Sequence, residues 1–226
     1  MILDRINGPK DLKTLSASER KELAQEIRQA MLKRASIHGG HFGPDFGIVE
    51  ATIALHTVFD SPKDKIVWDV SHQVYPHKIL TGRKQAYLEE EHYDDVSGYS
   101  NPAESEHDFF EVGHTSTSIS LASGLAMARD LQGGHENIIA VIGDGSMSGG
   151  EALEGLDTVG EMGTNMIIVL NDNQISIAEV HGGMYKGFEE LRRTGGKSEH
   201  NLFRAMGLDY RFVAEGNDSE APIKGF

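Results

Sequence analysis

Cysteine is absent from this 226-residue sequence, so disulfides, thiolate metal sites and catalytic thiols are all excluded. Basic residues are also scarce: 21 lysines and arginines stand against 35 acidic residues, which gives a formal net charge of −14. A general nucleic-acid binder, or a protein that docks on anionic membranes, needs the opposite balance, so we expect no nucleic acid and no membrane as partners. No apolar run reaches the ~18 residues that a membrane span needs. Residues 1–5 lack the basic-then-apolar pattern of a secretory signal, and these absences together predict a cytoplasmic protein.

Hydrophobic residues make up 38% of the chain, which is enough to bury a core. Ser16 and Glu19 have the spacing of a capping box, and apolar residues then recur four positions apart, which predicts a helix over residues 17–36. Residues 48–59 carry apolar side chains on one helical face and predict a second helix. Small residues dominate 117–131, which is the profile of a closely packed, buried helix.

The clearest unit of the sequence is a strand, a helix and a second strand. The apolar runs 138–142 and 166–170 predict strands, and 149–162 predicts the helix between them. Strands that are apolar throughout are typical of a parallel sheet covered on both faces, whose crossovers are right-handed. Residues 66–70 predict another buried strand. The expected fold class is therefore α/β, a parallel sheet flanked by helices.

The remaining segments have less regular patterns. Residues 71–113 are rich in histidine, glycine and proline and are expected to be irregular. Helices are expected over 185–193 and 199–206, and residues 209–213 are compatible with one more strand. With no internal repeat and no low-complexity linker, residues 1–226 are interpreted as one domain.

Two polar clusters stand where the strands of the central unit end: 143–146, Gly-Asp-Gly-Ser, and 171–173, Asn-Asp-Asn. Because parallel sheets bind ligands at the carboxyl ends of their strands, both clusters should lie at the same edge. The carboxylate of Asp144 and the amide oxygen of Asn173 are hard ligands suited to Mg²⁺, whose shell is often completed by phosphate oxygens. Gly145 lets the backbone approach a phosphate, and the next helix points its positive end there. Each cluster alone is also an ordinary turn, but together they predict a metal–diphosphate site.

The two clusters together resemble the thiamine diphosphate motif, and flanking segments narrow the resemblance. These segments are Gly39-Gly40-His41, 68–73 (Trp-Asp-Val-Ser-His-Gln), 75–83 (Tyr-Pro-His-Lys-Ile-Leu-Thr-Gly-Arg) and 113–118 (Gly-His-Thr-Ser-Thr-Ser). Nearly the whole chain is similar to the N-terminal, diphosphate-binding domain of the 1-deoxy-D-xylulose-5-phosphate synthase family. The resemblance implies the fold of that domain, with thiamine diphosphate and Mg²⁺ as cofactors.

The resemblance also implies roles for individual residues. The Mg²⁺ ligands would be Asp144, the side chain of Asn173 and the backbone carbonyl of Ile175. The residues that would contact the thiamine diphosphate are His72, Gly113, His114, Thr115, Gly145, Ser146 and Asn173. His41 and His72 are the catalytic candidates, because an imidazole near the thiazolium and the substrate can move a proton at neutral pH.

In the reaction that the resemblance implies, pyruvate loses carbon dioxide and the remaining two-carbon unit is joined to an aldehyde phosphate, glyceraldehyde 3-phosphate. The family's cofactor lies between this domain and a pyrimidine-binding domain, which would follow Phe226, and the full enzyme is expected to be a homodimer. The last strand usual in the domain is not recognisable after 220–223. We therefore expect a truncated domain that is inactive alone.

Three positions depart from the family pattern. Pro44 stands in a loop where the family usually has a serine, and this leaves the acceptor substrate open. Ser146 and Ile175 replace the customary alanine and methionine, which are mild changes if Ile175 binds metal only through its carbonyl.

Two other interpretations stay open at this point. The chain could be the N-terminal subunit of a two-chain transketolase that acts on ketose phosphates, although the segment 75–78 favours the synthase. It could also be a non-catalytic domain that binds a diphosphate or nothing at all.

Overall fold

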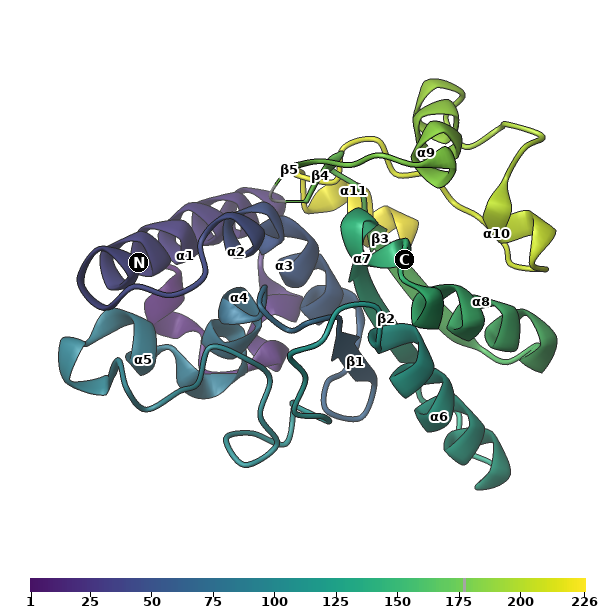
Figure 1. Ribbon diagram of the computed structural model, residues 1–226. Coiled ribbons are helices and arrows are strands. Elements are labelled where there is room, and N and C mark those ends of the chain that lie inside the picture. Colours follow the sequence, from purple (N-terminus) through teal and green to yellow (C-terminus); the bar gives the residue numbers. More distant parts are fainter. Residues whose placement is uncertain (177) are drawn as a thin grey trace.

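The computed structural model describes residues 1–176 and 178–226, and within them a parallel sheet has the strand order β1-β2-β3 (Figure 1). The strands span Lys65–Trp68 (β1), Ile138–Gly143 (β2) and Met166–Asn171 (β3). Ala140 pairs with Val67 on one side and with Ile168 on the other, so all three strands run in one direction. The predicted α/β class and its strand–helix–strand unit are confirmed.

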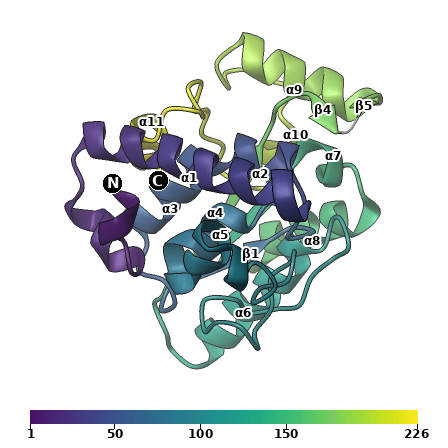
Figure 2. The same cartoon turned by 90° about the vertical axis from the view of Figure 1, so that its left-hand side faces the viewer.

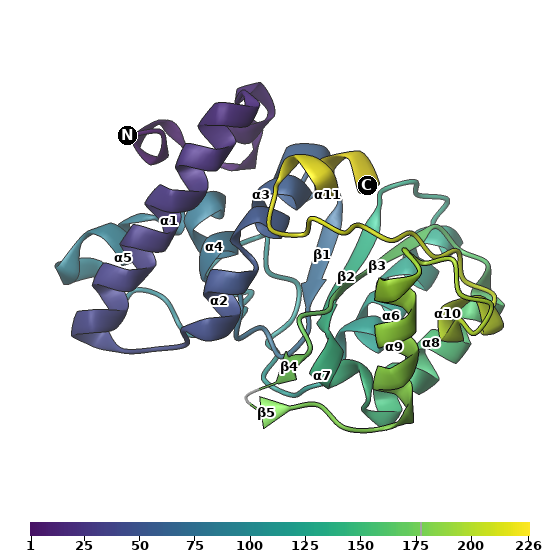
Figure 3. The same ribbon diagram turned by 90° about the horizontal axis from the view of Figure 1, so that it is seen from above.

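Alternating side chains of β2 face two separate cores, one on each face of the sheet. Ile138, Ala140 and Ile142 pack with the buried residues of α6 (Ser118–Leu131) and α8 (Gly150–Met162). Ile139 and Val141 point the other way, toward Leu55 of α3 and its neighbours. Figure 3 shows α6 and α8 on one side of the strands and α3 (Val49–Val58) on the other. Every residue of β3, by contrast, is only half-buried.

A helical layer at the N-terminal side has a core of its own, and α1 (Ala17–His38) lies across it over α3 and α5 (Gln85–Leu88) (Figure 2). The predicted capping box begins α1: the N–H of Glu19 donates to Ser16 Oγ (3.3 Å), and the N–H of Ser16 donates to Glu19 Oε2 (2.9 Å). This helix and the predicted helices over 48–59, 149–162 and 185–193 are confirmed, the last as α9 (Gly183–Arg193).

The remaining elements are short. They are η1 (Leu3–Arg5), η2 (Pro9–Thr14), α2 (Gly43–Gly47), α4 (Tyr75–Lys78), η3 (Ile79–Arg83), η4 (Glu90–His92), α7 (Asp144–Met147), β4 (Ile175–Ser176), β5 (Ala178–Glu179), α10 (Leu202–Ala205) and α11 (Glu220–Gly225). Strands β4 and β5 form an antiparallel pair apart from the main sheet. Helix α11 lies beside α3, and Phe226 packs its ring 5.7 Å from that of Phe59.

Several expectations were wrong in detail. Helix α6 is buried on one face only: Ala122 and Ala126 have no exposed surface, whereas Gly124 and Ala128 are exposed. Residues 71–113 contain four short helical segments, and Gly82, with a left-handed backbone (φ +93°), kinks the chain inside η3.

Two C-terminal expectations also need correction. The helix expected over 199–206 starts only after Asn201, whose side-chain oxygen accepts from the N–H groups of Phe203 (3.0 Å) and Arg204 (3.3 Å) and so caps it. Residues 209–213 do not form a strand, because the apolar groups there serve packing: the ring of Tyr210 stacks on Phe203 with centroids 5.3 Å apart. Among the helices of the described residues, none has the length and apolar character that a membrane span requires.

Candidate active site

The two chain segments that carry the candidate metal ligands meet at the carboxyl edge of the sheet. Strands β2 and β3 end side by side, since Gly143 pairs with Asn171. Asp144, which begins α7, is 3% exposed, and its Oδ1 accepts from the N–H of Gly145 (2.9 Å) while its Oδ2 accepts from the N–H of Gln174 (2.9 Å). The structure therefore brings together the two clusters that the sequence placed at the ends of neighbouring strands.

Asp172, to which sequence reasoning gave no individual role, supplies a second carboxylate. One of its oxygens accepts from the guanidinium of Arg192 in α9, and the other, Oδ1, is buried without a hydrogen-bond partner among the described residues. Burial, followed by the neighbouring charge of Asp172, raises the pKa of Asp144. Two adjacent carboxylates with one unpaired buried oxygen form a hard donor set that fits a divalent cation such as Mg²⁺. The sequence did contain a signal for this role of Asp172, because its carboxylate lies in the polar cluster directly after a predicted strand.

The other predicted ligands lie on the turn that leads out of β3. Asn173 is exposed there, and Gln174 has a left-handed backbone (φ +67°) that turns the chain back toward Asp144. Ile175 opens β4 and pairs through its backbone with Glu179. Its side chain lies outside what the structure describes, and its carbonyl as a ligand stays a prediction. Ser146 is half-buried on the α7 side.

A buried carboxylate that sequence reasoning missed, Asp69, fixes the loop before α6 to the same edge. Asp69 is 1% exposed and directly follows β1; its Oδ1 accepts from the N–H of Ser116 (2.9 Å) and its Oδ2 from the N–H of Ser118 (3.0 Å). Ser116 Oγ in turn donates to the carbonyl of Ser146 (2.7 Å). Gly149 makes this approach possible, because a Cβ there would lie 2.0 Å from Ser116 Oγ.

The predicted cofactor-lining segment is carried by this loop. Gly113, His114 and Thr115 are all exposed, and His114 Nδ1 lies 2.6 Å from the carbonyl of Thr115. Because Ser116 ties the loop to Ser146, the segment lies on the same side of the sheet as the candidate metal ligands.

The two catalytic candidates, His41 and His72, face each other from different loops. Their ring centroids are 5.8 Å apart with the planes at 89°. Burial lowers the pKa of His41, and burial and then the nearby His41 lower that of His72, so both are neutral at pH 7. The Nδ1 atom of each is buried without a hydrogen-bond partner in the described part of the chain. Paired neutral imidazoles suit proton transfer to or from a ligand between them.

A second layer that the sequence did not reveal positions His41. The backbone N–H of His41 donates to the hydroxyl of Tyr75 (3.1 Å), and the N–H of Tyr75 donates to Oδ1 of Asp45 (2.8 Å). Asp45 has no exposed surface, and its burial raises its pKa. Pro44 lies in the first turn of α2, a position where proline fits a helix without loss of a hydrogen bond.

The family model for 1-deoxy-D-xylulose-5-phosphate synthase matches residues 3–204 of this chain. The chain belongs to the 1-deoxy-D-xylulose-5-phosphate synthase family. The synthase of Halalkalibacterium halodurans is 49% identical over 195 residues, 86% of this chain and 31% of the relative. That of Desulfitobacterium hafniense is 46% identical over 229 aligned residues, 99% of this chain and 36% of the relative. A 1-deoxy-D-xylulose-5-phosphate synthase 2 from Geobacter sulfurreducens is 52% identical over 183 residues. The chain thus spans about a third of the length of these relatives.

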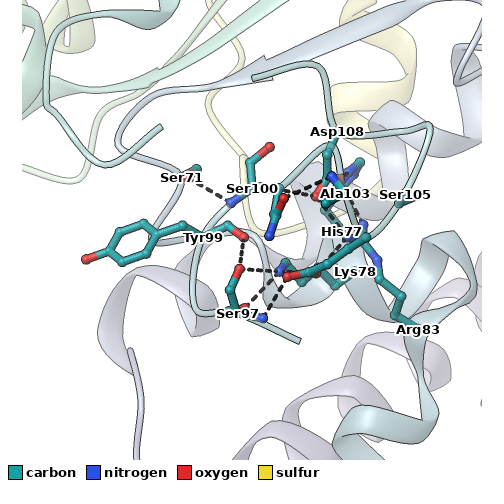
Figure 4. Close-up of polar contacts among 12 residues, drawn as sticks. Ser71, His77, Lys78, Arg83, Ser97, Tyr99, Ser100, Ala103, Ser105 and Asp108 are labelled. Carbon is teal, nitrogen blue, oxygen red and sulfur yellow. Dashed lines mark hydrogen bonds and ion pairs between the residues drawn. The ribbon is translucent and has the colours of Figure 1, made fainter. Parts of the chain in front are cut away.

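In one segment that carried the resemblance to the synthase family, 75–83, the residues after Tyr75 build a buried polar network beside the site. His77 has no exposed surface and lies between His56 (2.9 Å) and Asp108 (3.0 Å), and the Trp68 ring is 5.4 Å from its own. Arg83 donates to both oxygens of Asp108 at 2.8 and 2.9 Å. In this synthase-family chain, His77 is therefore structural, and the loop that ends at Asp108 is anchored to α4 and η3 (Figure 4).

Proposed function

We propose that this chain is the diphosphate- and Mg²⁺-binding domain of a thiamine diphosphate-dependent transferase of the 1-deoxy-D-xylulose-5-phosphate synthase type. The observation that carries the proposal is the meeting of Asp144 with the turn after β3, next to the unpaired buried oxygen of Asp172. A carboxylate pair of this kind is expected where a cation balances its charge. The parent reaction would be decarboxylation of pyruvate and condensation with glyceraldehyde 3-phosphate.

In this proposal the chain's own residues bind and orient the cofactor. Mg²⁺ would be held by Asp144, Asn173 and the carbonyl of Ile175, and Arg192 would keep Asp172 oriented beside them. Gly145 and Ser146 would contact the diphosphate, and Asn173 would reach it through the metal. The residues that would line the rest of the cofactor are His72, Gly113, His114 and Thr115. Bound thiamine diphosphate supplies the nucleophilic carbon that makes cleavage of a keto acid's carbon–carbon bond possible.

His41 and His72 would hold or accept protons beside that carbon. Because burial keeps both imidazoles neutral near pH 7, each can accept a proton as well as donate one. Their rings are perpendicular with centroids 5.8 Å apart, so both imidazoles are close enough to act on one small ligand.

We further propose that turnover requires a pyrimidine-binding domain, since the relatives are about three times longer than the region they share with this chain. The homodimer is proposed from the family resemblance alone. The family match favours the synthase over a transketolase subunit. A domain that binds a diphosphate without catalysis remains the contrasting outcome of the test.

The test is the thermal midpoint measured by scanning calorimetry with Mg²⁺ plus thiamine diphosphate and with Mg²⁺ plus inorganic pyrophosphate. A ligand present at 100 times its dissociation constant stabilises by about 2.7 kcal/mol. We expect both ligands to raise the midpoint, Asp144→Asn or EDTA to abolish both shifts, and Asp157→Ala, a change at an exposed acidic residue of α8, to leave them intact. Absence of any shift in the native chain would contradict the proposal.

A further inference from the structure

The loop that passes over His41 is held rigidly before Tyr99. Lys78 has no exposed side-chain surface; its Nζ donates to the carbonyl of Ser97 (2.8 Å) and to Oε2 of Glu104 (2.6 Å). The second oxygen of Glu104 accepts from the N–H of Ser97 (2.7 Å), so one buried ion pair holds both backbone groups of that residue (Figure 4).

The same loop is held immediately after Tyr99. The N–H of Ser100 donates to Oγ of Ser71 (3.0 Å), the residue before His72, and Ser71 Oγ donates to the carbonyl of Val112 (2.7 Å). One position further on, the N–H of Asn101 donates to Oδ2 of Asp108 (2.8 Å). Tyr99 therefore sits between two fixed backbone points, one of which adjoins a catalytic candidate.

The side chain of Tyr99 is directed away from this network, as Figure 4 shows, and toward His41. Its ring centroid lies 5.0 Å from that of His41, with the planes at 71°, whereas the His72 centroid lies 5.8 Å from that of His41. Tyr99 is 38% exposed, whereas the packing tyrosines Tyr87 and Tyr93 are at most 3% exposed. In the described residues its hydroxyl has no hydrogen-bond partner, so a rigid loop presents a ring and a free donor beside His41.

The charges around Tyr99 restrict what the hydroxyl would recognise. The two cations of the segment, Lys78 and Arg83, are already paired with Glu104 and Asp108. Arg34 is 3% exposed and lies against the rings of Tyr75, Tyr87 and Tyr93. Among the described residues of segment 75–83 and of the Tyr99 loop, a phosphate or a carboxylate would therefore find no unpaired cation, whereas an uncharged carbonyl or hydroxyl oxygen needs only the phenol donor.

We propose that Tyr99 is a substrate-binding residue whose hydroxyl contacts a carbonyl or hydroxyl oxygen of the aldehyde acceptor, and that Lys78 and Glu104 are its positioning residues. The inference rests on the function proposed above. The Tyr99 ring forms the wall of the site on the His41 side, and its hydroxyl favours acceptors with an uncharged oxygen near the reacting carbon.

The test uses the 226-residue chain with Mg²⁺ and thiamine diphosphate, with its six tyrosine rings isotope-labelled for NMR. D-Glyceraldehyde and pyruvate are titrated separately, with the imidazole signals of His41 as a second reporter. We expect D-glyceraldehyde to shift the Tyr99 signal. Loss of one such hydrogen bond in Tyr99→Phe should raise the dissociation constant for D-glyceraldehyde about 5-fold and that for pyruvate less than 2-fold. Tyr185→Phe, a half-buried tyrosine of α9, is the matched control and should change neither.

Cofactor binding, read from the thermal midpoint, separates the two proposals. A native chain without a cofactor-dependent shift contradicts the proposed function. If the cofactor binds but D-glyceraldehyde leaves the Tyr99 signal unmoved, or binds Tyr99→Phe as tightly as the native chain, the role of Tyr99 is overturned. Failure of D-glyceraldehyde to bind at all overturns it as well.

Discussion

Asp69, the residue after β1, accepts a hydrogen bond of 3.0 Å from the N–H of Ser118, the first residue of α6. The same carboxylate also accepts from the N–H of Ser116 (2.9 Å). A side chain from one strand end thereby satisfies the first backbone donor of a helix 49 positions further along the chain.

Replacement of Asp69 should therefore be costly. We expect Asp69→Ala to lower the free energy of unfolding by about 3 kcal/mol, since two buried N–H groups lose a charged acceptor. Asp69→Asn keeps one acceptor oxygen and should cost about half as much. Urea denaturation followed by circular dichroism measures both, and Asp157→Ala is the control that should stay within about 0.5 kcal/mol. Equal stability of Asp69→Ala and the native chain would contradict the capping role.

Gly149 should tolerate no side chain. A Cβ there would lie 2.0 Å from Ser116 Oγ, whereas a Cβ at the neighbouring Gly150 would meet nothing within 4 Å. We expect Gly149→Ala to destabilise by about 2 kcal/mol and to weaken the pyrophosphate-dependent thermal shift, because the loop that carries 113–115 must move. Gly150→Ala is the matched control, and the idea fails if the two variants behave alike.

The ion pair of Lys78 and Glu104 should show strong coupling. Lys78→Met leaves the largely buried carboxylate of Glu104 with Arg83, 3.3 Å away, as its one remaining cation among the described residues, and should cost about 3 kcal/mol. The double variant Lys78→Met, Glu104→Gln should cost clearly less than the sum of the two single changes, as measured by urea denaturation. Lys33→Met, which breaks an exposed pair with Glu90, should change stability by less than about 0.5 kcal/mol. Additive costs for the buried pair would show that it contributes no coupling.

Stability should fall as the pH falls below neutrality. Burial lowers the folded-state pKa of His56 and of His77, and it lowers that of His107 to about 4. Below about pH 6.5 these histidines bind protons in the unfolded chain but not in the folded chain. Their contribution to the free energy of unfolding is therefore complete above that pH and is lost as the pH falls to about 4.

Denaturation in urea at pH 7.5 and pH 5.5 checks this direction. His56→Gln removes one of the titrating groups and should reduce the difference between the two pH values. His135→Gln, at an exposed position, should leave the difference unchanged and also controls for the general effect of the acidic surface. A His56→Gln variant with the native pH dependence would contradict the assignment.

The sequence predicted the parts of this structure that are decided locally. The apolar runs 138–142 and 166–170 predicted two neighbouring parallel strands, of which β2 is buried and β3 half-buried, and the carboxyl ends of these strands bring Asp144 and residues 171–174 together. A capping box acts over three residues, so the start of α1 was predictable as well.

What the sequence did not reveal depends on partners far apart in the chain. Three contacts join segments that no periodicity in the sequence relates. They are the hydrogen bonds that Asp69 accepts, the ion pair of Lys78 and Glu104, and the contact of Tyr99 with His41. The strand expected over 209–213 was wrong for the same reason. The apolar side chains of this segment pack on a tertiary partner, Phe203, instead of on a neighbouring strand. The functional roles of the histidines came only from family resemblance and stay predictions.

Trp68 is the chain's one tryptophan, it is 2% exposed, and its ring lies 5.4 Å from the imidazole of His77. A protonated imidazole quenches indole emission by contact, whereas a neutral one does so weakly. The intrinsic fluorescence of Trp68 therefore reports, without any label, the protonation of the buried histidine network and the arrival of water in it. The network that anchors the Tyr99 loop thus contains its own optical probe.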